Sequence, residues 1–322
     1  MPNKLLKRSM IFKLFKKSKR RIINVVMERR FGRFKKEVVE KILSPVVTTD
    51  LIAEWLVSKE PFFVGRLGSG ECDICWNYAR ASFLSKKHNA NKYGSAQQHQ
   101  GISNSGDPYL DRFASIYIAA IPHADLIAIW ELRGIYAMLC KFGAPDLHIT
   151  HLETLGPPFP LTSDGRPWPR FLAGKRVLVV HPFARSIQMQ YARRSKVKSI
   201  CDLLPDFELF TIVPPVTFAG QDNGRTWVAN LQSLMSEVAK QQFDVALIGC
   251  GAYGFPLGAF VKQMGRQAIH LGGATQILFG IRGKRWDERE AFSSAFMDDT
   301  WVRPLEDERP IDPNIVESGC YW

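Results

Sequence analysis

Residues 243–254 read FDVALIGCGAYG, and this stretch decides the fold. Residues 243–248 predict a fully buried strand, and residues 249–254 predict a tight turn that leads into a helix over 255–264. A second buried strand is expected over 267–271, where it ends in Gly272 and Gly273. Buried strands that alternate with helices and end in glycine turns predict a parallel α/β sheet.

The glycines in these turns indicate a site for an anion. Gly249, Gly251 and Gly254 allow backbone N–H groups to approach a phosphate, and the following helix directs the positive end of its dipole there. The spacing alone is not specific, because tight turns in any parallel α/β sheet need glycine. A dinucleotide site would also need an acidic residue after the next strand, where this chain has Gly272-Gly273-Ala274. A nucleotide-type ligand and a purely structural turn both stay open.

The same alternation runs through the rest of the chain. We expect further helices over 48–59, 72–80, 107–121, 132–142, 184–196 and 225–241, and further strands over 62–64, 126–130, 148–152, 175–180 and 209–213. The polar residues 85–107 predict a long surface loop, and residues 283–322 predict a tail that packs over the domain. The fold class is therefore α/β, a Rossmann-like and mostly parallel sheet with helices on both faces, over residues 46–322.

Positive charge is concentrated at the N-terminus. The net charge is +12, and residues 1–40 hold 14 of the 43 Lys and Arg but only 3 of the 31 Asp and Glu. Apolar residues in this segment fall on one helical stripe between lysines and arginines, which predicts a basic amphipathic helix within residues 1–45. Such a helix fits an anionic membrane surface, with a solvated leader as the alternative. Nucleic acid is not expected, because it would not explain the apolar stripe.

No secretory signal is evident, because the apolar run 22–27 is short and is followed at once by Glu28, Arg29 and Arg30. The six cysteines have irregular spacing and predict reduced thiols. We therefore expect a cytoplasmic protein that is peripheral to the inner face of the cell membrane.

Strand ends at one edge of a parallel sheet converge, so four segments are expected around one crevice. They are residues 66–73, 181–185, 249–254 and 272–276. Arg66 can fork onto a phosphate or carboxylate, and Gly68 and Gly70 permit close backbone approach. Glu71 and Asp73 are candidates to accept a proton or hold a divalent cation. In the structural alternative, Glu71 only caps a helix and pairs with Arg66.

These segments resemble the GT-D fold glycosyltransferases. The resemblance is carried by Arg66-Leu67-Gly68-Ser69-Gly70-Glu71, by residues 182–187, by residues 246–254 and by residues 269–280, and it continues to Trp286. It spans roughly residues 46–322 and leaves out the basic segment. In that family an Asp-x-Glu pair serves nucleotide-sugar and metal binding.

The resemblance implies transfer of a sugar from a nucleotide-diphosphate sugar, such as a UDP-hexose, to a hydroxyl of a cell-surface glycan or lipid-linked acceptor. Glu71 and Asp73 are then the catalytic candidates, and Glu71 is the candidate ligand for Mn²⁺ or Mg²⁺. The implied nucleotide-sugar site contains Arg66, Gly68, Ser69, Gly70, His181, Arg185, Gly249, Gly251, Tyr253, Gly254, Gly272 and Gly273.

One position departs from the family pattern. Ser69 stands where better-known members carry Asp, so a metal-free route stays open, with Arg66, Arg185 or Lys284 neutralising the leaving diphosphate. Tyr253 or Trp286 could stack on a uracil or sugar, or belong to the core. The functional alternatives are another Rossmann-type transferase, such as an S-adenosylmethionine-dependent methyltransferase, and a non-catalytic membrane-surface scaffold.

Overall fold

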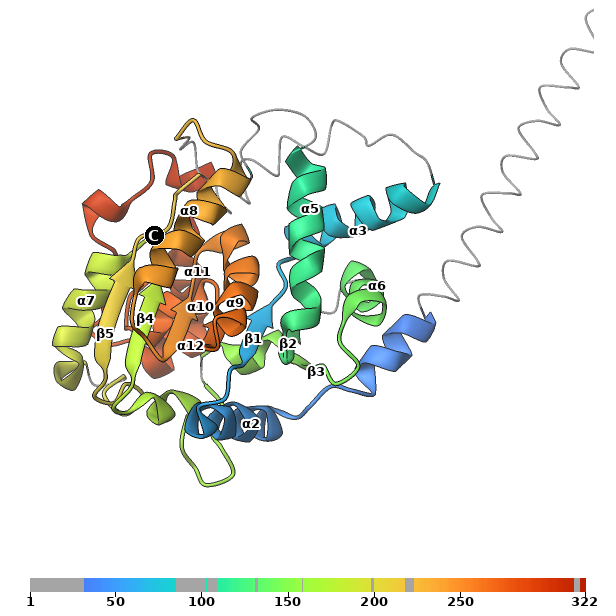
Figure 1. The fold of residues 1–322 in the computed structure, drawn as a ribbon. Helices are drawn as coiled ribbons and strands as arrows, with labels where there is room; N and C mark the ends of the chain where they lie inside the picture. Colours follow the sequence, from blue (N-terminus) through green and yellow to red (C-terminus); the bar gives the residue numbers. More distant parts are fainter. Residues whose placement is uncertain are drawn as a thin grey trace, which may run out of the picture.

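The protein contains a seven-stranded sheet in which all strand pairs are parallel (Figure 1). The computed structural model describes residues 32–84, 102, 109–130, 133–157, 159–197, 200–217, 223–315 and 319–322. The strand order is β3-β2-β1-β7-β6-β4-β5. The strands are β1 (Phe63–Arg66), β2 (Leu126–Ile129), β3 (His148–His151), β4 (Arg176–Val180), β5 (Glu208–Ile212), β6 (Val245–Ile248) and β7 (Gln267–His270). The predicted parallel α/β sheet is confirmed.

Helices cover both faces of the sheet. One face carries α3 (Ser69–Leu84), α5 (Tyr109–Ala120), α6 (Arg133–Phe142), α8 (Trp227–Lys240) and α9 (Gly254–Gln263). The other carries α2 (Pro45–Ser58), α7 (Ala184–Ala192), α10 (Ala274–Leu278), α11 (Lys284–Asp287) and α12 (Glu290–Phe296). In β4, Leu178 and Val180 join the first core, whereas Val177 and Val179 join the second. Burial on both faces explains why the strands are continuous apolar runs.

A helical stretch over residues 32–39 precedes α2, and short 3-10 helices complete the described elements. They are η2 (Ile121–His123), η3 (Leu152–Leu155), η4 (Trp168–Leu172), η5 (Arg194–Lys196), η6 (Gly251–Tyr253), η7 (Glu306–Glu308) and η8 (Pro313–Ile315). The predicted elements are confirmed, with boundaries that differ by a few residues. Helix α2 starts earlier than expected because Ser44 caps it, accepting a hydrogen bond from the Val47 amide (3.3 Å). Helix α3 starts at Ser69, so Gly70 and Glu71 belong to its first turn.

Residues upstream of α2 also pack on the domain. Val38 is buried, and Ile42 forms a parallel bridge with Ile149 next to β3. The predicted amphipathic helix lies largely in residues 1–31, outside the described residues. The predicted loop over 85–107 also lies outside them, except for Ile102, which is fully buried. Among the helices that the structure describes, none is long and apolar enough to cross a membrane.

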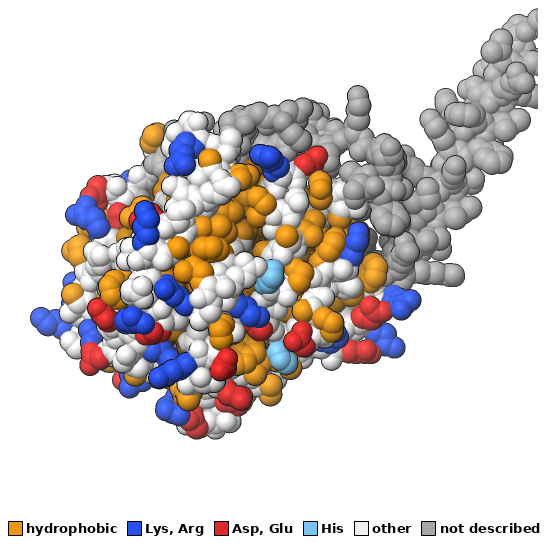
Figure 2. Space-filling model, viewed as in Figure 1, with side chains coloured by type: hydrophobic (Ala, Val, Ile, Leu, Met, Phe, Trp, Pro, Cys, Tyr) orange, Lys and Arg blue, Asp and Glu red, His pale blue; other side chains and the backbone are white. Residues whose placement is uncertain are grey.

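The surface of the described domain mixes both signs of charge. Figure 2 shows Lys and Arg side chains and Asp and Glu side chains spread around the margin of one face, with hydrophobic side chains gathered over its middle. This distribution agrees with the sequence, in which residues 41–322 hold 29 basic and 28 acidic side chains.

Connections at the carboxyl edge of the sheet leave on alternate faces. The chain passes from β1 to α3 and from β6 to α9 on one face, and from β7 to α10 and from β4 to α7 on the other. These four strands are neighbours in the order β1, β7, β6, β4. Because neighbouring connections diverge, they leave a crevice beyond the strand ends, which is the usual ligand position in open α/β sheets.

Residues 283–315 and 319–322, here called the C-terminal strap, run back over the domain. The amides of Arg282 and Lys284 donate to the carbonyls of Val302 (2.7 Å) and Trp322 (2.9 Å). Further along the strap, Trp301 is buried in the second core. The prediction that the tail packs over the domain is confirmed, and the chain ends among the helices (Figure 1).

Candidate ligand site at the carboxyl edge

A pocket of about 720 Å³ lies at the carboxyl ends of the strands. Its walls combine residues that follow β1, β2, β4, β6 and β7 with one residue of α5 and four of the strap. The lining residues are Arg66, Gly68, Ser69, Gly70, Glu71, Tyr117, Trp130, His181, Pro182, Phe183, Gly249, Gly251, Ala252, His270, Gly272, Gly273, Gln276, Arg285, Arg289, Tyr321 and Trp322. The glycine turns after β1, β6 and β7, which the sequence analysis singled out, therefore all contribute to one pocket.

The turn from β1 to α3 places a carboxylate against the backbone. A Cβ atom built on Gly68 would overlap Glu71 Oε2, so a larger residue here would displace the carboxylate from its present position. The Cys72 amide donates to the Gly68 carbonyl (3.0 Å), which starts the helix at this point. A carboxylate in the first turn is also stabilised by the positive end of the helix dipole. The position of Glu71 in the first turn of α3 is therefore compatible with the structural alternative, in which it caps the helix.

Burial still dominates the ionisation of Glu71. It raises the pKa of the carboxyl above its ordinary value, while the Glu71 backbone amide and the nearby Arg66 guanidinium work in the opposite direction. Tyr117 lines the same pocket, where burial, followed by the nearby Glu71 carboxylate, raises the pKa of its hydroxyl. A carboxylate with a raised pKa is suited to accept a proton near neutral pH.

Arg66 links the turn after β1 to the turn after β7. Its Nη1 donates to the Leu271 carbonyl (3.0 Å). A Cβ on Gly272 would lie 3.2 Å from Arg66 Cδ, and the φ of +56° at Gly272 also favours glycine. Burial lowers the pKa of Arg66, and the neighbouring Arg285 lowers it further. Two guanidinium groups therefore share this side of the pocket, and arginine keeps its charge in proteins.

Two buried histidines also line the pocket. His181 follows β4 and His270 ends β7, and both lie beside the end of β6. Burial lowers the pKa of each imidazole to about 3; Arg66 adds to the effect at His270. Both rings are therefore neutral at physiological pH.

The turn from β6 to α9 provides space rather than side-chain charge. A Cβ on Gly249 would lie 2.6 Å from His181 Cδ2 and 2.7 Å from Thr275 Oγ1. Gly251 has a φ of +57° and open space above its Cα. These features allow a ligand to approach the backbone ahead of α9.

The strap closes the pocket with cationic and aromatic side chains. Arg285 lies 5.0 Å from the centroid of the Tyr321 ring, and Trp322 packs edge-on against Phe183 at a centroid distance of 4.6 Å. Arg289 completes the cationic part of the lining. Sequence reasoning did not assign these residues to the site, nor Tyr117, Trp130 and His270, because they carry no local motif.

Two predicted site residues point elsewhere. Asp73 is exposed and does not line the pocket, because positions two apart on a helix face different sides and Glu71 takes the inward side. Arg185 is also exposed and forms an ion pair with Asp307 of the strap. The structure therefore places neither Asp73 nor Arg185 among the residues that line this pocket.

Tyr253 and Gly254 have structural positions. The Tyr253 ring is buried and stacks on Trp227 at 5.5 Å, and its hydroxyl is hydrogen-bonded to Thr217 (2.9 Å). A Cβ on Gly254 would lie 2.2 Å from His270 Cε1, so this glycine makes room for the imidazole. Neither residue lines the pocket.

Trp286 and Lys284 are likewise outside the lining. Trp286 is buried beneath Gly273, and Lys284 lies 3.8 Å from Glu288 across one helical turn. Arg285, between them in sequence, is the residue that reaches the pocket.

The side chains around Glu71 do not form a metal cage. Among the described residues, no group of three or more His, Cys, Asp or Glu side chains is placed to hold a metal ion. Asp73, the expected second carboxylate, faces away. Mg²⁺ and Mn²⁺ prefer several oxygen ligands, so the residues present do not fit a protein-held divalent cation.

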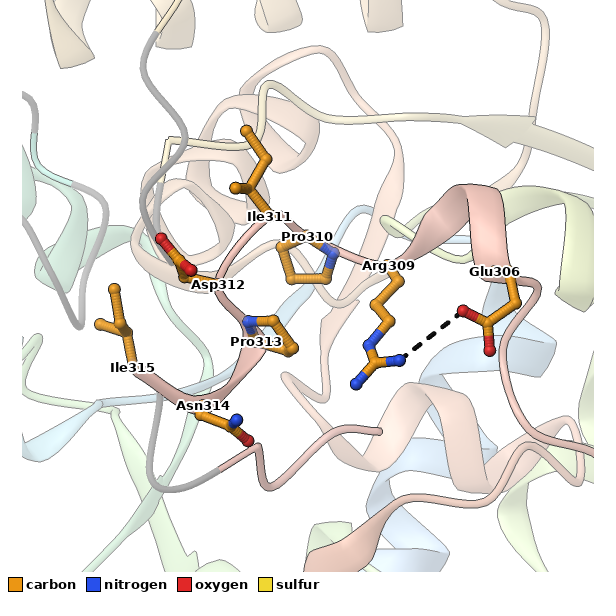
Figure 3. Close-up of a pocket in the computed structure, with 8 residues that line it drawn as sticks. All are labelled: Glu306, Arg309, Pro310, Ile311, Asp312, Pro313, Asn314 and Ile315. Atoms are coloured by element: carbon orange, nitrogen blue, oxygen red, sulfur yellow. Dashed lines mark ion pairs between the residues drawn. The ribbon is translucent and has the colours of Figure 1, made fainter.

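A second hollow lies at the end of the strap. It has a volume of about 510 Å³ and is lined only by residues 306–315. Within it, Arg309 and Glu306 form an ion pair (3.6 Å) (Figure 3). Because one segment supplies all the lining, no groups from different elements converge there, and the pocket at the carboxyl edge is the candidate functional site.

No protein-family model, no curated protein and no solved structure matches this chain. The functional conclusion therefore depends on the chemistry of the pocket.

Proposed function

We propose that the protein is a glycosyltransferase that moves a sugar from a nucleotide-diphosphate sugar, such as a UDP-hexose, to an acceptor hydroxyl. One observation carries the proposal: Glu71 shares a pocket at the carboxyl edge with Arg66, Arg285 and Arg289. The GT-D resemblance of the strand-end motifs adds to it. A carboxylate and a surplus of cations are what this transfer needs.

The arginines suit a diphosphate leaving group. Guanidinium groups bind phosphate oxygens in bidentate fashion, and they stabilise the negative charge that develops as the sugar leaves. The N-terminus of α3 and the 3-10 helix η6 ahead of α9 line the same pocket, so backbone amides add to the positive potential. This supports the metal-free route.

Glu71 is the base in the proposed reaction. The acceptor oxygen forms a bond to the anomeric carbon, the bond from that carbon to the diphosphate oxygen breaks, and the acceptor proton passes to the Glu71 carboxylate. The electron pair of the broken bond stays on the diphosphate, beside Arg66 and Arg285. The raised pKa of the Glu71 carboxyl suits this residue to act as the base.

The three arginines disfavour a methyltransferase. S-adenosylmethionine carries a sulfonium cation at the reacting centre, and a pocket with three guanidinium groups and one carboxylate repels it. A non-catalytic scaffold would need neither a carboxyl with a raised pKa nor neutral imidazoles in a pocket. The sugar-transfer function is therefore favoured over both alternatives.

Thermal-shift measurements with a panel of nucleotide sugars and S-adenosylmethionine test this choice. We expect a nucleotide sugar to raise the melting temperature and S-adenosylmethionine to leave it unchanged. Donor hydrolysis, followed with and without Mn²⁺, then identifies the sugar. Stabilisation by S-adenosylmethionine alone would overturn the proposal.

The basic N-terminal segment extends the proposal to location. We propose that it holds the enzyme on an anionic inner membrane face, near a lipid-linked acceptor for a bacterial cell-surface polysaccharide. Replacing Lys13, Lys16 and Lys17 by Gln should weaken flotation of the full chain with phosphatidylserine vesicles, because each basic residue near the surface contributes about 1 kcal/mol. Unchanged flotation would remove this role.

A further inference from the structure

The two buried imidazoles have opposite hydrogen-bonding character. The Phe183 backbone N–H donates to His181 Nδ1 (3.0 Å), so the proton of the neutral ring lies on Nε2. His270 Nδ1 lies 3.1 Å from the Ile248 carbonyl, which can only accept, so the proton of this ring lies on Nδ1. His181 Nε2 is therefore a donor, and His270 Nε2 is an acceptor.

The backbone fixes both rings beside the end of β6. His181 packs against Gly249, and His270 packs against Gly254. Both rings line the pocket, and neither Nε2 atom has a hydrogen-bond partner among the described residues. One donor and one acceptor thus remain for a ligand, on neighbouring strands on either side of β6.

A diphosphate cannot satisfy this pair. Phosphate oxygens at neutral pH accept hydrogen bonds, so they fit His181 Nε2–H but are repelled by the lone pair of His270 Nε2. A hydroxyl both donates and accepts. Two hydroxyls of a sugar ring can therefore serve both imidazoles at once, while Arg66, Arg285 and Arg289 hold the anionic part.

We propose that His181 and His270 form a hydroxyl-binding subsite that recognises the sugar of the donor. This inference rests on the proposed function and assigns an orientation within it, with the diphosphate toward Arg66 and Arg285 and the sugar toward β6. The two histidines are specificity-determining residues. A ligand without the sugar loses these contacts but keeps those to the arginines.

Isothermal titration with UDP and with UDP-glucose tests the orientation. His270→Phe keeps the ring and removes the acceptor; we expect the Kd for UDP-glucose to rise about tenfold, as for one lost hydrogen bond, and the Kd for UDP to change less than twofold. His123→Phe, at a partly exposed histidine outside the pocket, is the control. Equal weakening of both ligands, or no change in either, would overturn the assignment.

Nitrogen-15 NMR of the imidazoles of the unaltered protein keeps the inference testable if His270→Phe fails to fold. We expect a proton on Nε2 of His181 and on Nδ1 of His270 at pH 7, and a shift of the His270 Nε2 signal with UDP-glucose that UDP does not cause. The reverse tautomers, or equal shifts with both ligands, would contradict it.

A different experimental result would show that the proposed function itself is wrong. If no nucleotide binds the unaltered protein, sugar transfer is refuted, and the subsite is then judged with free hexoses at millimolar concentration. Shifts of both Nε2 signals with a hexose would support the hydroxyl subsite. Unmoved signals would reject it.

Discussion

The charged and the neutral groups that line the pocket have different roles. The charged wall, which consists of Arg66, Glu71, Arg285 and Arg289, supplies ionised side chains from β1, α3 and the strap. The neutral wall, which consists of His181, Gly249, Gly251 and His270, supplies uncharged rings and backbone space from β4, β6 and β7. A ligand with an anionic half and a hydroxyl-rich half matches both. Charge and shape are therefore separated within one site.

The largest effect is expected at the carboxylate of the charged wall. Glu71→Gln keeps the size of the side chain but removes the base, and general-base loss costs about two to four orders of magnitude in kcat. Asp73→Asn is the matched control, two residues along the same helix and outside the pocket. The acidic limb of the kcat profile should also lie above the ordinary glutamate pKa of about 4.3, because burial raises the pKa of Glu71. Equal losses from both substitutions would remove Glu71 from the chemistry.

The neutral wall makes stability depend on pH. The unfolded chain binds protons at His181 and His270 below the ordinary pKa of 6.5, whereas the folded protein does not until about pH 3. The free energy of unfolding therefore falls as pH falls through this range, by roughly 2 kcal/mol per histidine at pH 5. Urea unfolding at pH 7 and pH 5 measures the loss, and His270→Phe should remove about half of it. If the free energy of unfolding of His270→Phe fell as much between pH 7 and pH 5 as that of the unaltered protein, His270 would not be buried in its neutral form.

Packing at the neutral wall is tested at Gly254. In Gly254→Ala the new methyl group would lie 2.2 Å from His270 Cε1, and overpacking of this kind costs about 1–3 kcal/mol. Gly134→Ala is the control, because its methyl group would meet other atoms only at 3.8 Å or more. Denaturant unfolding compares the two variants. A stable Gly254→Ala protein would show that the imidazole can move.

An effect of similar size is expected on the ligand affinity of the charged wall. Arg285→Gln should raise the Kd for UDP about tenfold to a hundredfold, because it removes a charge-assisted contact. Arg309→Gln, in the same strap but paired with Glu306 away from the pocket, should leave the Kd unchanged. The difference should shrink at high salt. Equal Kd values for the two variants would place the diphosphate elsewhere.

The sequence predicts the residues at the strand ends better than the residues of the strap. Gly68, Glu71, Gly249 and Gly272 follow buried strands directly, so local pattern and the topology of parallel sheets bring them to one edge. The strap residues reach the same edge through packing with elements far away in the chain, such as the contact of Trp322 with Phe183. No local pattern encodes such a contact.

The sequence pattern also does not predict in which direction a side chain points. Asp73 lies two residues from Glu71, yet it faces away from the pocket because the helix starts at Ser69 and not at Cys72. His270 ends an apolar strand, and its role emerges only from the Ile248 carbonyl beside it. Helix starts and ring tautomers depend on tertiary contacts, so they follow from the structure and not from the sequence.

A crystal structure with UDP bound tests the central claim most directly. The account predicts the diphosphate between Arg66 and Arg285 at the carboxyl edge of the sheet, with the neutral wall left free for the sugar. A diphosphate bound against His270, or outside this pocket, would contradict it.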